Sequence, residues 1–433
     1  MYTEEIQGLF QFLKSSPTAF HAVDSACRTL SGFTPLKECE KWNLVPGGKY
    51  YVTRNRSSII AFTLPEGDFD SFRMVASHSD SPTFKIKENA EISVRDHYIQ
   101  LDVERYGGMI FSTWFDRPLS IAGRVILRDA QGLHTRLVDL GRPAVMIPNV
   151  AIHMNREVNS GYKYNAAVDM MPLWSDFAGK GSFRDKIAEA CGAKAEDVVG
   201  SDLFLYNPME GCQWGVNGEF ISAPRLDDLE CAYSSLQAFR DLTPRGHVNL
   251  CCIFDNEEVG SGTKQGADSS FLTDVLARVG AALGADDAAL RAAACRSFMV
   301  SADNAHAVHP NHPEKYDAEN RVFMNGGVVI KHNANQKYTT DAVSSAVFSE
   351  ICARAGVPVQ HFSNRSDVLG GSTLGNIANT HLSMNTVDIG LAQLAMHSSY
   401  ETAGTADVEY MIKALRAFYG TNVQMTGDGE YRI

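Results

Sequence analysis

The apolar positions near the N-terminus follow the period of an α-helix. Within residues 1–30 they recur three or four positions apart, as at Ile6, Phe10 and Leu13. A Ser-Ser-Pro sequence at 15–17 interrupts this spacing and is typical of a turn. The pattern therefore predicts two short helices joined by a turn.

The following segments have the pattern of β-strands. Residues 50–64 and 72–77 are short apolar runs, and turn-forming residues at 54–58 divide the first of them. From about 92 to 139 apolar and polar residues alternate, with a second turn at 129–132. Alternation with a period of two is expected for half-buried strands. We therefore predict antiparallel hairpins in this region.

Beyond residue 224 apolar strands alternate with helical segments, which is typical of a largely parallel sheet covered by helices. The predicted fold class is therefore α/β, with a mixed, largely parallel sheet flanked by helices. We expect a discontinuous domain formed by residues 1–92 and 218–433. A β-rich insert at 93–217 interrupts it.

Composition and charge exclude several classes of protein. The 433 residues, 44% of them hydrophobic, can bury a large core, and the longest apolar runs fall far short of the roughly 20 residues that span a bilayer. A net charge of −12 disfavours binding to nucleic-acid phosphates. The nine cysteines are scattered and odd in number. We expect a cytoplasmic protein with reduced thiols that binds neither membrane nor nucleic acid.

Side chains with metal-binding or acid–base chemistry follow three apolar runs, at the point where each run stops. They are His78 and Asp80, then Glu257 and Glu258, and then Asp303. In an open α/β sheet, ligands bind beyond the carboxyl ends of the strands. The sequence therefore predicts that these side chains gather at one edge of the sheet.

Two of these pairs have a spacing that suits metal chemistry. Asp80 can hold the second ring nitrogen of His78, which orients a histidine ligand. Of the adjacent Glu257 and Glu258, one carboxylate can bind a metal while the other takes a proton from water. The alternatives are a histidine in a serine-rich turn and a solvated acidic loop. Gly260, which permits a tight turn after a buried run, favours the metal site.

A further acidic pair and a further histidine are ambiguous by themselves. Asp227 and Asp228 begin a predicted helix, where aspartate often serves only as an N-cap. His397 could equally be a core or a surface histidine. Taken together, one histidine and one carboxylate per ion, with one shared carboxylate, fit a site for two divalent metals.

Seven motifs, in order along nearly the whole chain, resemble the aspartyl aminopeptidase family of metallopeptidases. They are SPTAFHAV at 16–23, SHSDSP at 77–82, YGG at 106–108 with TWFDR at 113–117, RLDD at 225–228, DNEEVGS at 255–261, SAD at 301–303 with AHAVHP at 305–310, and MHS at 396–398. The resemblance implies a catalytic α/β domain with a smaller β-rich insert.

The resemblance also implies a role for each candidate side chain. The metal ligands would be His78 and Asp303 for one ion, Glu258 and His397 for the other, and Asp227 as the bridge. Glu257 would be the general base, and Asp80 would orient His78. We expect two divalent ions per subunit, with zinc first and cobalt or manganese as alternatives.

Members of the family assemble as tetrahedral dodecamers, so the resemblance implies a homododecamer in which the insert mediates oligomerisation. His153 matches a family histidine that reaches into a neighbouring subunit's site. Without the resemblance, His153 would be interpreted as a core histidine in an apolar strand.

Two departures from the family pattern concern the substrate pocket. Asn335 stands where aspartate-selective members have a lysine, and Asn376 stands where proline is expected. A buried acidic substrate side chain needs a cationic partner, which Lys331, Lys337 or Arg365 could supply. The preferred N-terminal residue therefore stays open between acidic and neutral or apolar ones.

The predicted activity is removal of the N-terminal residue from peptides with a free N-terminus. A related two-metal deacylase or dipeptidase is one alternative. A non-catalytic assembly protein with the same fold is the other, although all five ligand positions and Glu257 are present.

Overall fold

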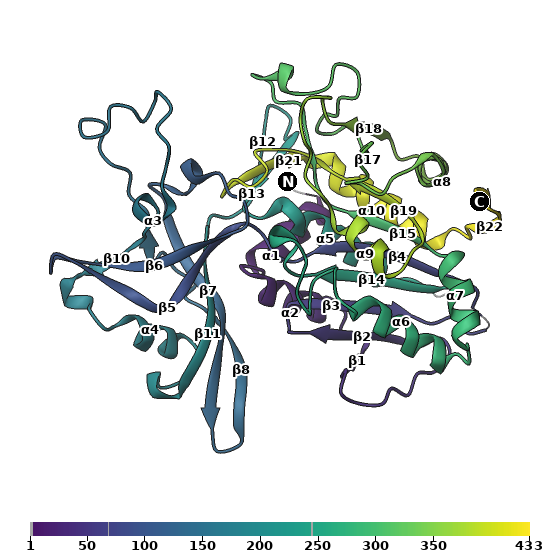
Figure 1. Ribbon diagram of the computed structural model, residues 1–433, viewed down its shortest axis with the longest axis horizontal. Helices are drawn as coiled ribbons and strands as arrows, with labels where there is room; N and C mark the ends of the chain where they lie inside the picture. Colours follow the sequence, from purple (N-terminus) through teal and green to yellow (C-terminus); the bar gives the residue numbers. More distant parts are fainter. Residues whose placement is uncertain (1–2, 68, 244–245) are drawn as a thin grey trace. The chain divides into compact units, whose positions relative to one another are not determined.

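The computed structural model describes residues 3–67, 69–243 and 246–433, which form two compact units (Figure 1). The larger unit comprises Met1–Asp80, Gly211–Met396 and Glu401–Ile433. The smaller unit comprises Ser81–Glu210 and His397–Tyr400. The domain boundaries predicted from the sequence, at 92/93 and 217/218, stay a prediction.

A nine-stranded mixed sheet forms the centre of the larger unit. Its strands, in spatial order, are β1 (Thr34–Leu36), β2 (Lys49–Arg54), β3 (Ser58–Thr63), β14 (Val248–Phe254), β4 (Phe72–His78), β15 (Phe298–Ala302), β19 (Asn385–Gly390), β17 (Val328–His332) and β18 (Val359–Ser363). The four central strands, β14, β4, β15 and β19, are parallel to one another. Antiparallel pairs join β3 to β14 and β17 to β19. The α/β prediction is confirmed.

Helices cover both faces of this sheet, which explains why its central strands are buried at almost every position. Along β4, Val75 belongs to one hydrophobic cluster, whereas Met74 and Ala76 belong to the other. The first cluster includes residues of α1 (Glu4–Lys14), α2 (Ala19–Thr29), α5 (Leu226–Phe239), α8 (Ala342–Ala355) and α10 (Thr405–Gly420). The second includes residues of α6 (Phe271–Ala282), α7 (Asp287–Cys295) and α9 (Leu374–His381).

The larger unit also contains a five-stranded sheet that the sequence pattern did not predict. Its order is β12 (Cys212–Trp214), β13 (Phe220–Ala223), β21 (Glu401–Gly404), β20 (Ala392–Leu394) and β16 (Ala305–His306). Each strand has only two to four residues, which is too short for a clear alternation of apolar and polar positions.

The smaller unit is built on a seven-stranded antiparallel sheet, as the alternating pattern predicted. Its strands, in spatial order, are β11 (Val198–Tyr206), β5 (Thr83–Val94), β6 (Tyr98–Tyr106), β10 (Leu173–Asp176), β9 (Val145–Met146), β7 (Pro118–Asp129) and β8 (Gly132–Asp139). An additional pairing of β11 with β7 closes the sheet into a ring. Between β9 and α3 (Ala166–Asp169), residues 147–165 form a long connection without a helix or strand longer than a single bridge.

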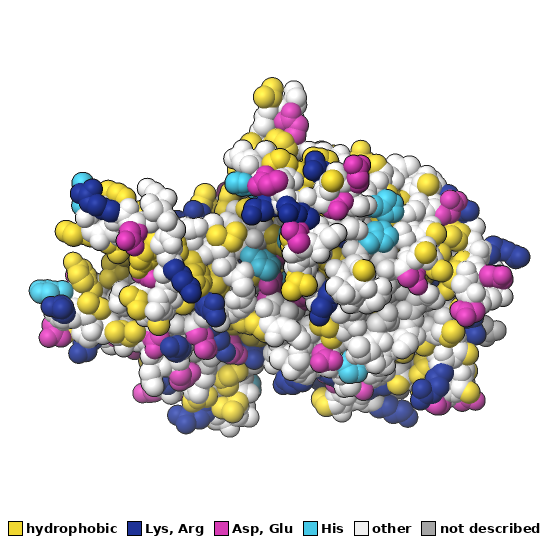
Figure 2. Space-filling view, turned by 45° about the horizontal axis from the view of Figure 1, so that its top comes forward, with side chains coloured by type: hydrophobic (Ala, Val, Ile, Leu, Met, Phe, Trp, Pro, Cys, Tyr) yellow, Lys and Arg dark blue, Asp and Glu magenta, His cyan; other side chains and the backbone are white. Residues whose placement is uncertain are grey.

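The surface carries side chains of both charges, which lie interspersed over the face shown in Figure 2. All nine cysteines are free thiols. Among the described residues, the helices are too short or too polar for any of them to cross a membrane.

Candidate metal centre

The predicted site residues follow neighbouring parallel strands at one edge of the central sheet. His78 is the last residue of β4 and pairs in register with Phe254, the last residue of β14. Glu257 and Glu258 follow β14 in a short 3-10 helix, and Asp303 directly follows β15. Because these strands are parallel, their carboxyl ends lie on the same side of the sheet.

The structure brings four of the five predicted ligands together within the larger unit. Ligand atoms of His78, Asp227, Asp228 and Asp303 all lie within 4.8 Å of one another, and so do those of His78, Glu257 and Glu258. The His78 Nε2 atom lies 3.5 Å from Asp227 Oδ1 and 4.0 Å from Asp303 Oδ1. The carboxylates of Asp227 and Glu258 also approach within 4.8 Å.

Asp80 contacts both His78 and the loop that carries Glu257 and Glu258. The His78 Nδ1 atom lies 3.1 Å from the backbone oxygen of Asp80 and 3.4 Å from its Oδ1. The same carboxylate accepts the backbone N–H groups of Glu257, at 3.1 Å, and of Glu258, at 3.2 Å. Asp80 therefore connects the histidine to the loop that carries the two glutamates, a connection that sequence reasoning missed.

The backbone around Asp227 departs from a helix at the point where α5 begins. Asp227 and Asp228 have non-helical dihedral angles, and the peptide bond between them is cis. The Asp227 N–H group donates to Glu401 Oε2 at 3.0 Å, and the Asp228 Oδ2 atom accepts the His78 N–H group at 3.0 Å. Asp228 thus holds the backbone of His78, which the sequence could not indicate.

Burial and crowding of carboxylates shift the acid–base equilibria of the cluster. Burial, together with the nearby Asp303 carboxylate, raises the pKa of Glu257 to about 8 against the opposing effect of His78. Burial likewise raises the pKa of Asp303 and of Asp228. Burial alone lowers the pKa of His78, but Asp228 and the other carboxylates outweigh it, so that this pKa is raised well above its ordinary value. The cluster thus crowds buried carboxyl groups together, which disfavours their ionised forms in the absence of a cation.

This set of donors fits divalent metal ions. Histidine nitrogen and carboxylate oxygen are ordinary ligands of zinc, with bond lengths of roughly 2.0–2.2 Å. Atoms that lie within 4.8 Å of one another can surround such an ion with small adjustments. Buried carboxylates that repel one another are costly unless cations pair with them. The residues present therefore suit the zinc chemistry that the sequence predicted.

His397 belongs to the smaller unit, so its part in the site stays a prediction. Within that unit its Nδ1 atom lies 2.7 Å from the backbone oxygen of Gly108, and its own backbone oxygen accepts the Ile110 N–H group at 3.0 Å. A proton on Nδ1, donated to Gly108, makes Nε2 the nitrogen with the lone pair. This tautomer is the one that a metal ligand binding through Nε2 requires.

His153 is exposed in the connection at 147–165. The interpretation as a core histidine in an apolar strand is therefore wrong, because the flanking apolar residues are also exposed, Ile152 at 48% and Met154 at 83%. A role in a neighbouring subunit's site stays a prediction.

Of the three candidate cations for substrate recognition, only Lys331 contacts a member of the cluster in the structure. Its Nζ atom lies 3.4 Å from Asp303 Oδ2 and donates to the Asp303 backbone oxygen at 2.8 Å. Lys337 is exposed, as is Asn335. Arg365 is also exposed and pairs with Asp367 at 2.7 Å.

Asn376, which stands where the family pattern has proline, lies in a helix. Asn376 is in the first turn of α9, and its Oδ1 atom accepts a hydrogen bond from the Ser372 hydroxyl at 2.8 Å. Asparagine is compatible with this conformation because its side chain bonds to the segment that leads into the helix.

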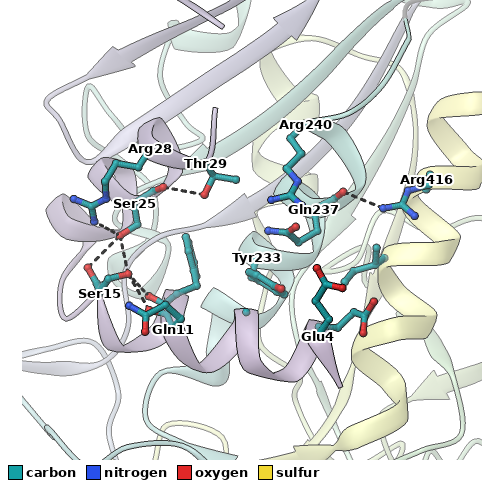
Figure 3. Close-up of a pocket in the computed structure, with 14 residues that line it drawn as sticks. Glu4, Gln11, Ser15, Ser25, Arg28, Thr29, Tyr233, Gln237, Arg240 and Arg416 are labelled. Carbon is teal, nitrogen blue, oxygen red and sulfur yellow. Dashed lines mark hydrogen bonds between the residues drawn. The ribbon is translucent and has the colours of Figure 1, made fainter. Parts of the chain in front are cut away.

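A separate cavity of about 680 Å³ lies among α1, α2, α5 and α10 (Figure 3). Its walls carry basic side chains such as Arg240 and Arg416, acidic Glu4, and the ring of Tyr233. None of the clustered histidine or carboxylate residues lines it. This cavity is therefore distinct from the candidate metal centre.

Comparison with known proteins places these features in a family. Residues 12–419 match the family model described as aminopeptidase I zinc metalloprotease (M18). A probable M18 family aminopeptidase 2 of Clostridium acetobutylicum is 48% identical over 421 residues, which cover 95% of this chain and 97% of that protein. A cryo-EM structure of the Ape4 and Nbr1 complex contains a chain with a TM-score of 0.92 and 34% identity, covering 96% of this chain and 85% of that one. The mApe1 dodecamer of S. cerevisiae gives a TM-score of 0.85 and 27% identity, with 96% of each chain covered.

Proposed function

The chain belongs to the M18 family of zinc metallo-aminopeptidases, which are hydrolases, and on that premise we propose that it removes N-terminal residues from peptides at a site for two divalent ions. The proposed ligands are His78 and Asp303 for one ion, Glu258 and His397 for the other, and Asp227 between them. Zinc is the proposed metal, with cobalt or manganese as alternatives.

One observation carries the proposal of two ions. The Asp227 carboxylate lies within 4.8 Å of ligand atoms of His78 and Asp303 and also within 4.8 Å of the Glu258 carboxylate. A carboxylate has two oxygens and can therefore serve two ions at once. This proximity supports Asp227 as the bridging ligand of the proposed site.

Each remaining side chain supports a distinct task in peptide hydrolysis. Bound divalent ions supply Lewis acidity, which lowers the pKa of the attacking water and stabilises the negative charge that develops on the carbonyl oxygen. Glu257 takes a proton from that water and passes it to the amine nitrogen as the C–N bond breaks. Asp80 orients His78 and holds the backbone of the glutamate pair through its hydrogen bonds.

We further propose a preference for acidic N-terminal residues. Lys331 is almost fully buried, and its ammonium group lies 3.4 Å from the Asp303 carboxylate. With Asp303 serving as a metal ligand, the Lys331 charge would be left to attract an acidic substrate side chain in the same low-dielectric region.

The active form that we propose is a homododecamer in the cytoplasm. The exposed connection at 147–165, with its apolar Ile152 and Met154, is suited to a contact with another copy of the chain. His153, on the same connection, would supply a hydrogen-bond donor to the carbonyl oxygen in a neighbouring subunit's site.

Metal removal and peptide chemistry test the proposed function together. Chelation should abolish hydrolysis of a peptide with a free α-amine, and zinc, cobalt or manganese should restore it. The same peptide with an acetylated N-terminus should not be cleaved. Hydrolysis by metal-free protein, or a preference for the acetylated peptide, would contradict the proposal and favour a different hydrolase.

A further inference from the structure

A buried amide side chain follows the proposed ligand Asp303 in the sequence. The Nδ2 group of Asn304 donates to Glu230 Oε2 at 3.1 Å and to Gln393 Oε1 at 2.9 Å. Its Oδ1 atom accepts a hydrogen bond from the thiol of Cys231 at 3.1 Å. Both donor hydrogens and the acceptor of the amide are therefore engaged, which defines its orientation.

The partners of Asn304 belong to other segments that carry proposed ligands. Glu230 and Cys231 lie on α5, one turn beyond Asp227. Gln393 lies on β20, four residues before His397 in the sequence. A single side chain thus connects three segments of the chain, each of which contributes a proposed ligand.

Asn304 and its two polar partners are buried. Asn304, Glu230 and Gln393 each have at most 3% of their surface exposed. Within the part of the chain that the structure describes, Glu230 Oε1 and Gln393 Nε2 have no hydrogen-bond partner. The bonds to Asn304 are therefore the side-chain hydrogen bonds that satisfy Glu230 and Gln393. A buried polar group that loses its hydrogen-bond partner destabilises the folded state.

The backbone on either side of Asn304 is also held. The Asp303 N–H group donates to Ile389 O at 3.0 Å, and the Ala305 N–H group donates to Leu391 O at 2.8 Å. These bonds attach the segment to the chain that leads into β20, but they do not reach α5. The Asn304 side chain makes that second connection.

We infer that Asn304 is a positioning residue, which sets the distance between the Asp303 carboxylate and the Asp227 carboxylate through its hydrogen bonds to Glu230 and Cys231 of α5. Asn304 does this without touching substrate. The inference rests on the proposed function, because it assigns a role toward the one ion that Asp227 and Asp303 would share. Partners behind metal ligands typically change metal affinity or activity about 10- to 100-fold when they are removed.

The test uses cobalt as the probe, because the visible absorption of Co²⁺ reports the geometry of its ligands. Asn304→Leu removes all three hydrogen bonds at similar volume. Glu230→Met removes one acceptor, whereas Glu230→Gln keeps an oxygen at the same place. The control is Gln360→Leu, since the Gln360 amide also makes three hydrogen bonds, to Phe323 and Gly327, but touches no ligand segment.

Asn304→Leu and Glu230→Met should weaken cobalt binding about 10-fold or more and change the visible spectrum. Glu230→Gln should bring both readouts back toward those of the unmodified protein, and Gln360→Leu should change only the unfolding temperature of the metal-free protein. If Asn304→Leu does not fold, the comparison of Glu230→Met with Glu230→Gln decides.

Unchanged cobalt affinity and spectrum in Asn304→Leu and Glu230→Met, with only a lower unfolding temperature, would overturn the inference and leave the proposed function intact. Failure of the unmodified protein to bind cobalt or to cleave peptides would overturn the proposed function, and the inference with it.

Discussion

The Nζ atom of Lys331 lies 3.4 Å from Oδ2 of Asp303, and both side chains are withdrawn from solvent, with 3% and 14% exposed. Burial lowers the pKa of Lys331, but Asp303 and other negative groups outweigh it, so the ammonium stays charged. A buried cation beside a proposed metal ligand can act on the ligand, on the substrate, or on both.

Specificity is the first testable consequence of this pair. Lys331→Met should lower kcat/KM for N-terminal Asp and Glu by about 10- to 100-fold more than for Leu or Met, since a charge-assisted hydrogen bond contributes roughly 1.5–3 kcal/mol. Rates across a panel of aminoacyl substrates measure this difference. The exposed Lys337→Met is the matched control and should leave the ratio unchanged. If the unmodified enzyme already prefers apolar N-terminal residues, Lys331 has no such role.

Asp80 should affect metal binding and catalysis together. Asp80→Ala removes the acceptor for the Glu257 and Glu258 N–H groups and the carboxylate beside His78 Nδ1. We expect about 10- to 100-fold weaker zinc binding and a comparable loss of turnover. Isothermal titration with zinc and steady-state kinetics give the two values. Intact zinc affinity in this variant would show that neither connection matters.

Asp407 should make stability depend on pH in a predictable direction. It accepts the Asn325 and Gly327 N–H groups, and burial raises its pKa to about 7. In the unfolded chain an aspartate ionises near 3.9. Because the folded pKa is the higher one, the stability that Asp407 contributes is complete below about pH 4 and is lost as the pH rises to about 7.

Urea unfolding of metal-free protein between pH 4 and 7 checks this expectation. The loss should amount to at most about 4 kcal/mol, and Asp407→Asn, which cannot ionise, should flatten the dependence. The comparison is between the slopes of the unfolding free energy against pH in the two proteins. Absolute stabilities are not compared, because asparagine replaces one acceptor by a donor and lowers stability at every pH. An equally steep slope in the variant would assign the effect to other groups.

The structure shows why sequence reasoning found most of the candidate site but not its support. His78, Glu257, Glu258 and Asp303 stand at or just beyond the ends of buried strands of five to seven residues, so their meeting at one sheet edge could be predicted from the order of the elements. The roles of Asp228 and Asn304 depend on contacts 150 and 74 residues apart along the chain, for which the local pattern carries no signal.

The same distinction holds for the fold. The alternating pattern from 92 to 139 is long enough to identify hairpins, and the turn predicted at 129–132 joins β7 to β8. The five-stranded sheet escaped prediction because its strands are short and because β13 and β20 carry buried residues next to one another. His153 lies in a connection without regular structure, where an apolar composition suggested a strand.

Assembly gives a fourth prediction. His153→Ala should keep metal content and oligomer size but lower turnover by roughly 100-fold, the scale for losing one donor to the carbonyl oxygen. Metal analysis, sedimentation and steady-state kinetics measure these three quantities. Mixing this variant with Glu257→Gln through dissociation and reassociation should restore some activity, because part of the mixed interfaces regain an intact site. Full activity of dissociated monomers would exclude a site completed by a second subunit.

In the proposed two-metal site, Glu257 is the general base and Glu258 is a metal ligand, and substituting each glutamate in turn tests this assignment. Metal content by mass spectrometry and turnover are measured together for Glu257→Gln and Glu258→Gln. We expect that Glu257→Gln keeps two ions per subunit and loses about 100-fold or more in turnover, whereas Glu258→Gln loses metal itself. Equal metal content with equal activity in both variants would contradict the proposed mechanism.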